Sequence, residues 1–124
     1  MQNVLLVAAG GALGSVSRFG LGLLVRRLWP SEFPLATLLA NVLGCLVIGA
    51  LVPVLERLGE GGRLFVLVGL LGGFTTFSAF GLETFQLARR EAWGLAAAYV
   101  AASLLFGLGA VWAGRGLSAA FLKG

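Results

Sequence analysis

Four long apolar stretches, separated by short polar breaks, dominate the pattern of residues along the chain. They run roughly over Val4–Val25, Leu35–Leu55, Leu64–Leu82 and Trp93–Trp112. With a rise of ~1.5 Å per residue, each stretch is long enough as a helix to cross the roughly 30 Å hydrocarbon layer of a bilayer. The pattern predicts an all-α membrane protein, with one four-helix transmembrane domain over residues 1–124.

The breaks contain nearly all of the charged residues and the residues that end helices. Pro30 and Pro34 lie in the first break, where they favour a loop. Trp29, Trp93 and Trp112 lie near the predicted ends of the stretches. Amphipathic rings favour the membrane–water interface, so these positions agree with the predicted spans.

The composition indicates a protein whose solvent is largely lipid. Charged residues make up 11% of the chain and apolar residues 59%, with a mean hydropathy of +1.00. A soluble domain has roughly 25% charged residues. The net charge of +4 comes from short clusters that flank the stretches, and no basic run exceeds two residues, which argues against nucleic acid as a partner.

The positive charges on the two sides of the membrane balance. Four spans place the second break and the C-terminus on one side and the first and third breaks on the other. The two sets of basic residues are Arg57, Arg63, Arg115 and Lys123, and Arg26, Arg27, Arg89 and Arg90. Because orientation follows the Lys and Arg bias, a balanced count favours insertion in both directions and antiparallel pairing. The alternative is a single orientation that a partner or weak local signals would set.

Glycine is abundant, with 20 residues, and small residues recur four positions apart. Gly10 and Gly14 form one such pair, and Gly69 and Gly73 form another. This spacing lets helix backbones approach closely in a membrane, so it favours tight helix contacts and a compact oligomer.

Polar side chains inside the stretches are the first candidates for a functional site. Asn41 lies within the second stretch, with Thr37 one turn before it. An amide offers two N–H donors, which suit a small anion stripped of water. Tyr99 and Ser103 are four apart, so they share one face of the fourth helix and bring two hydroxyls to membrane depth. Hydrogen bonding between helices is the alternative role for all four residues.

The third stretch contains the run Gly-Gly-Phe-Thr-Thr-Phe-Ser-Ala-Phe over residues 72–80. Adjacent glycines followed by β-branched residues form poor helix, so we expect a break near Gly73–Thr76. In a membrane such a break requires protein or a cavity to satisfy the freed backbone groups, and its carbonyl oxygens can bind a cation. A kink used only for packing is the alternative.

Phe77 and Phe80 are three apart and share a helix face. The edges of their rings are positive and could hold an anion weakly enough to release it. Contact with lipid or packing in the core is the ordinary role of such rings. Arg18 lies within the first stretch, about 10 Å from its end by helix rise. It is either an interface anchor or a cation at an aqueous vestibule. Glu83 is expected to end the third span, reaching the headgroups or the pore mouth.

Taken together, these motifs resemble the Fluc (CrcB) fluoride channel family over nearly the whole chain. The matching segments are Gly10–Gly14 followed by Arg18, Pro34–Gly44 with Thr37 and Asn41, and Gly72–Phe80 followed by Glu83. The last segment is the most specific. Ala36, Cys45 and Ala79 depart from the family pattern. Ala79 replaces a usual Thr, so we expect slower conduction or a shifted contact.

The resemblance implies an antiparallel, dual-topology homodimer in the cell membrane, of the bacterial inner-membrane type, surrounded by lipid. It implies two pores that export fluoride passively. The residues it assigns to the pore are Asn41, Phe77, Phe80, Tyr99, Ser103, Thr37, Thr76 and Ser78. It places Arg18 and Glu83 at the vestibule, and it gives the main-chain oxygens of Gly72 and Thr75 to a central structural sodium ion.

Two other classes of membrane protein remain as alternatives. A small proton-coupled multidrug exporter would need a carboxylate deep in the first span, where this chain has Arg18 and no acid. A membrane scaffold or lysis protein would need neither Asn41 nor a broken third helix. An enzyme is not expected, because the chain has no His, no Asp and no nucleophile paired with a base.

Overall fold

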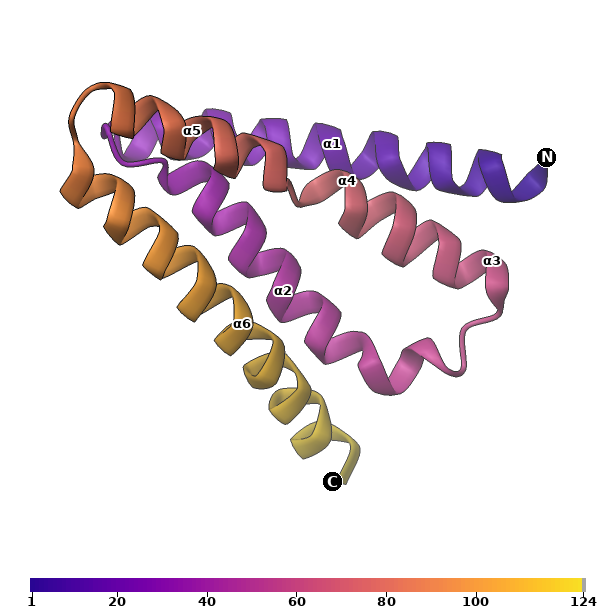
Figure 1. Cartoon of the computed structure of the whole chain (residues 1–124). Helices are drawn as coiled ribbons and strands as arrows, with labels where there is room; N and C mark the ends of the chain where they lie inside the picture. The colour runs from indigo at the N-terminus through magenta and orange to yellow at the C-terminus, as the bar shows by residue number, and fades with distance from the viewer. Residues whose placement is uncertain (124) are drawn as a thin grey trace.

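The computed structural model describes residues 1–123, and every regular element in that range is a helix (Figure 1). The elements are α1 (Gln2–Leu28), α2 (Leu35–Leu55), α3 (Glu60–Arg63), the π-helix η1 (Leu64–Leu71), α4 (Gly72–Phe74), α5 (Phe77–Arg89) and α6 (Trp93–Lys123). Gly124, the last residue of the predicted domain, lies outside the described residues.

Over residues 1–123, four helical segments are long and apolar enough to cross a membrane. They are Gln2–Leu28, Leu35–Leu55, Glu60–Arg89 and Trp93–Lys123. The predicted all-helical class with four spans is therefore confirmed, and the chain is a multi-pass membrane protein.

Helices extend beyond the predicted spans at several ends. The largest difference on the third span is at its C-terminal end, where α5 continues from Leu82 to Arg89. Hydropathy marks the segment that tolerates lipid, whereas helix length depends on backbone propensity. Between residues 82 and 89 the chain contains Leu, Glu, Gln, Ala and Arg, which all favour helix. Glu83 therefore lies inside α5 and does not end this helix.

Glycine backbones bring α1 against η1 and α4. A Cβ atom on Gly10 would collide with the carbonyl oxygen of Phe65, and one on Gly14 would collide with that of Leu70. A Cβ atom on Gly69 would lie 2.9 Å from the Cα of Gly10. The small residues at four-residue spacing thus form tight contacts within one chain.

A second glycine contact joins α2 to α6, which run side by side in Figure 1. A Cβ atom on Gly49 would collide with the carbonyl oxygen of Val111, and one on Gly114 with that of Leu46. The fold therefore consists of two helix pairs whose members alternate along the chain. The first span packs on the third, and the second span packs on the fourth. Where α2, α5 and α6 meet, a small core forms around the fully buried Tyr99.

Candidate functional site

An interruption of two residues separates α4 from α5. Thr75 has φ −85° and ψ 157°, and Thr76 has φ −153° and ψ 115°, so both have extended backbone. Their hydroxyls satisfy the flanking helix ends. Thr75 Oγ1 donates to the carbonyl oxygen of Leu71 at 2.9 Å, and Thr76 Oγ1 accepts from the amide of Ala79 at 3.1 Å as the N-cap of α5.

The side chain of Asn41, from α2, binds the backbone of this interruption. Its Nδ2 donates to the carbonyl oxygen of Thr76 at 3.0 Å, and its Oδ1 accepts from the amide of Thr76 at 2.8 Å. Two of the freed backbone groups are thereby satisfied within the membrane. One N–H of the amide is committed to this role, and the amide has a second N–H to offer a ligand.

Arg18, from α1, binds the backbone of α4 just before this interruption. Its Nε donates to the carbonyl oxygen of Gly73 at 3.2 Å, and Ser15 Oγ lies 3.5 Å from the same oxygen. A cation at the carbonyl end of a helix is favourable. The sequence predicted an anchor or a vestibule cation for Arg18 but did not predict this backbone contact.

The hydrogen bonds at the interruption leave three carbonyl oxygens over. Leu71, Gly73 and Thr76 each accept a hydrogen bond through their carbonyl oxygens. Among residues 1–123, no such hydrogen bond reaches the carbonyl oxygen of Phe74, and none reaches those of Gly72 and Thr75. The oxygens of Gly72 and Thr75 are the two that the resemblance assigns to sodium, and hard cations prefer oxygen ligands. No cluster of three His, Cys, Asp or Glu residues that could hold a metal occurs in the same range.

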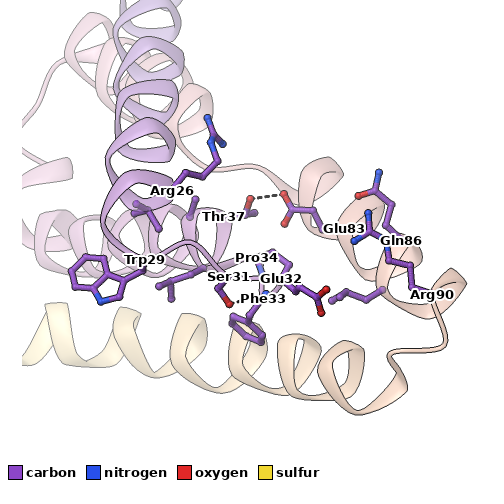
Figure 2. A pocket seen from close by; sticks show the side chains of 14 residues that line it. Arg26, Trp29, Ser31, Glu32, Phe33, Pro34, Thr37, Glu83, Gln86 and Arg90 are labelled. Carbon is purple, nitrogen blue, oxygen red and sulfur yellow. Dashed lines mark hydrogen bonds between the residues drawn. The ribbon is translucent and has the colours of Figure 1, made fainter.

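Glu83 connects three helices through its carboxylate. Thr37 Oγ1, from α2, donates to Oε1 at 2.7 Å, and the Tyr99 hydroxyl, from α6, donates to Oε2 at 2.7 Å. Figure 2 shows the Thr37–Glu83 bond. Bonds to a charged acceptor are short and strong. Thr37 and Tyr99, both predicted at the pore, thus share one carboxylate.

Four aromatic rings lie in a row that passes this carboxylate. The row begins at Phe33, continues through Tyr99 and Phe80, and ends at the exposed Phe77. Phe77 and Phe80 lie 5.5 Å apart between ring centroids, tilted by 45°. Phe80 and Tyr99 are 5.2 Å apart at 63°, and Phe33 and Tyr99 are 5.6 Å apart at 74°. Both contacts of Tyr99 have the edge-to-face arrangement that aromatic pairs prefer. Nothing in the sequence indicated a role for Phe33, which is an apolar residue beside Pro34.

Several of the predicted site residues surround a single cavity of about 380 Å³, here called the phenylalanine cavity. The predicted residues that line it are Asn41, Gly72, Thr75, Thr76, Phe77, Phe80 and Ser103. Ser103 Oγ is buried and has no hydrogen-bond partner within the described part of the chain. The Phe77 side chain is 83% exposed, so the cavity opens on the outer face of the chain.

The remaining predicted residues lie beside this cavity. Arg18, Thr37 and Glu83 line a second cavity of about 380 Å³, which Ala79 also lines. Thr37 and Glu83 also line a third of about 240 Å³ that includes Phe33 (Figure 2). The Ser78 hydroxyl lies 3.3 Å from that of Thr76, at the start of α5.

A comparison with protein families matches residues 5–115 to the family described as CrcB-like protein, Camphor Resistance (CrcB). Curated proteins are similar over nearly the whole chain. The fluoride-specific ion channel FluC of Methylobacillus flagellatus is 48% identical over 118 residues, covering 92% of each chain. The fluoride-specific ion channel FluC of Paracoccus denitrificans is 49% identical over 123 residues, covering 95% of this chain and 98% of its own.

A third relative, the fluoride-specific ion channel FluC 2 of Symbiobacterium thermophilum, is 50% identical over 115 residues. The alignment covers 90% of this chain and 94% of the relative. All three relatives are named as channels and none as an enzyme, in agreement with the prediction that this chain is not an enzyme.

Proposed function

The chain belongs to the CrcB-like protein family, and from this membership we propose that it is a fluoride-selective passive channel. The observation that carries the proposal is the phenylalanine cavity. It gathers the amide of Asn41, the buried hydroxyl of Ser103 and the rings of Phe77 and Phe80, with no charged side chain among its lining residues.

This set of groups suits a small anion that has shed its water. The Ser103 hydroxyl and the second N–H of Asn41 are donors that no described residue uses. Ring edges add weak positive potential. Conduction requires a site that replaces hydration but lets the ion leave, and a fixed positive charge in the cavity would hold the anion too long.

The proposal includes a second copy of the chain. Polar groups such as the Ser103 hydroxyl and the extended backbone of Thr75 and Thr76 are not tolerated against lipid, so the open side of the cavity requires cover. The balanced basic residues on the two sides of the membrane favour an antiparallel partner. A two-fold axis between the copies would give two equivalent pores per dimer.

The carbonyl oxygens of Gly72 and Thr75 fit a structural sodium ion, because neither has a partner within residues 1–123. In the proposed dimer these oxygens from both copies would hold it. The ion would supply a fixed positive charge that stabilises the extended backbone. Arg18 and Asn41 keep the neighbouring carbonyl groups of Gly73 and Thr76 occupied.

On this proposal, Thr76 supplies a hydroxyl within the phenylalanine cavity and Ser78 supplies one next to it. Thr37 and Tyr99 supply hydroxyls at Glu83, which borders a vestibule together with Arg18. Fluoride that enters a bacterial cell as the neutral acid dissociates inside, so its anion would leave through the channel down its own gradient. The inner membrane is the location that this role requires.

Proteoliposomes that contain the full chain and sodium test the proposal. They are loaded with fluoride or with chloride, and efflux is started with a potassium ionophore and followed by ion-selective electrodes. We expect rapid loss of fluoride with chloride retained. Absence of fluoride efflux from folded, sodium-containing protein would overturn the channel function and favour a scaffold or exporter.

A further inference from the structure

We infer that Phe33, in the loop before α2, is a positioning residue that holds the Tyr99 ring and thereby aims the carboxylate of Glu83. The inference rests on the proposed channel function, because it assigns Phe33 a role in the rate of fluoride flux. It concerns a residue outside the transmembrane helices.

Tyr99 is held between two rings. Its side chain has 0% exposure, the largest fully buried side chain of the described residues. Phe80 meets the ring from α5 at 5.2 Å and 63°, and Phe33 meets it from the loop at 5.6 Å and 74°. Contacts from both rings therefore limit the directions that the phenol can take.

The loop fixes Phe33 by bonds of its own backbone. The amide of Phe33 donates to Ser31 Oγ at 3.1 Å, and its carbonyl oxygen accepts from the amide of Leu35 at 2.7 Å. Pro34, which follows it, has φ −75°, close to the value its ring imposes. Figure 2 shows the Phe33 ring directed from this loop toward α6.

The direction of the phenol decides how Glu83 is held. Tyr99 donates to Oε2 and Thr37 donates to Oε1, so each carboxylate oxygen has one hydroxyl. Phe33 lines the cavity of about 240 Å³ that also reaches Glu83 and Thr37. Loss of the Phe33 ring would enlarge this cavity toward Tyr99, free the phenol to turn and admit water to the carboxylate.

The chain contains one tyrosine, so a single label reports on Tyr99 alone. Protein made with tyrosine labelled with ¹³C at Cζ gives one resonance, whose position follows the hydrogen bond of the hydroxyl. The variants are Phe33→Leu, which removes the ring, and Phe33→Trp, which keeps an aromatic ring and adds no tyrosine. Trp29→Leu is the matched control, since Trp29 lines the same cavity but lies outside the core cluster around Tyr99.

We expect Phe33→Leu to shift the Tyr99 resonance and to slow fluoride efflux from proteoliposomes by about two- to tenfold, the range of one aromatic contact. Phe33→Trp restores both readouts, and Trp29→Leu changes neither. If Phe33→Leu does not purify as a single species, Phe33→Met, which also lacks a ring, replaces it with the same expectation.

Wild-type efflux in Phe33→Leu, or an unmoved Tyr99 resonance, overturns the inference. A fall in efflux without a shift of the resonance would mean that Phe33 only packs the loop. A wild-type protein that conducts no fluoride would overturn the proposed function instead, while the resonance would still report whether Phe33 positions Tyr99.

Discussion

Asn41 binds Thr76 through both polar atoms of its amide, donating to the carbonyl oxygen at 3.0 Å and accepting from the amide at 2.8 Å. In a β-sheet, a residue of one strand likewise donates to a carbonyl oxygen and accepts from an amide of its neighbour. Here the side-chain amide of Asn41 takes the place of that neighbouring backbone. One side chain thus supports the extended backbone from which the candidate pore is built.

Asn41→Leu should destabilise the protein and abolish fluoride efflux. It leaves both backbone groups of Thr76 unpaired, and each unsatisfied group costs about 1–3 kcal/mol. Asn41→Asp, which keeps an acceptor for the Thr76 amide but places a carboxylate at the cavity, should fold better and still not conduct. Thermal unfolding in detergent and vesicle efflux separate the two effects. Wild-type efflux in Asn41→Leu would contradict the role given to this residue.

Arg18→Met should lower stability and slow efflux. The variant keeps the apolar stem but removes the donor to the Gly73 carbonyl oxygen, a charged hydrogen bond of about 1.5–3 kcal/mol. Arg27→Met, at an exposed position in the last turn of α1, is the matched loss of positive charge. Equal unfolding temperatures and efflux rates for the two variants would show that Arg18 acts through its charge and not through its hydrogen bond to Gly73.

Thr37→Val and Tyr99→Phe should not act independently. Each removes one hydroxyl from the carboxylate of Glu83, and groups that share a partner show coupling of about 0.5–3 kcal/mol. We expect the double variant to differ from the sum of the single variants by that amount, measured by chemical denaturation in micelles. Strict additivity would mean that the two hydroxyls do not share Glu83 in the membrane.

Gly14→Ala should prevent α1 from packing on the third span. The added Cβ atom would collide with the backbone at Leu70, and the amide nitrogen of Phe74 would lie 2.8 Å away, so the helices must separate. Overpacking costs about 1–3 kcal/mol or more.

Gly20→Ala is the control on the same helix, because a Cβ atom there meets nothing within 4 Å. Size-exclusion chromatography of the two purified variants distinguishes them. A monodisperse Gly14→Ala protein with wild-type elution would contradict the close contact.

Much of the architecture follows from local sequence properties. Apolar length predicts the four spans, and the Gly-Gly-Phe-Thr-Thr run indicates poor helix where Thr75 and Thr76 are extended. Within the phenylalanine cavity, polarity at membrane depth indicated Asn41 and Ser103, and spacing indicated Phe77 and Phe80. The dimer, the sodium ion and the pore roles stay predictions.

The contacts that the sequence did not predict depend on how helices are rotated against one another. Arg18 on Gly73 and Tyr99 on Glu83 join residues from different spans, and hydropathy contains no information on rotation. The π-helical turns of η1 have more residues per turn than an α-helix. A 3.6-residue period therefore does not predict which side chains of the third span share a face. The role inferred for Phe33 depends on its contact with the Tyr99 ring, which joins residues far apart in the sequence.

The alternating pairing of helices has a consequence for biosynthesis. α1 is synthesised before residues 60–74, which pack on Gly10 and Gly14. α2 is synthesised before α6, which supplies the backbone against Gly49. α1 therefore lacks its final neighbour until the third span has been synthesised, and α2 lacks its final neighbour until the fourth has been. Membrane insertion of the early helices therefore precedes their packing, and the packing of α2 must wait for the last helix to be synthesised.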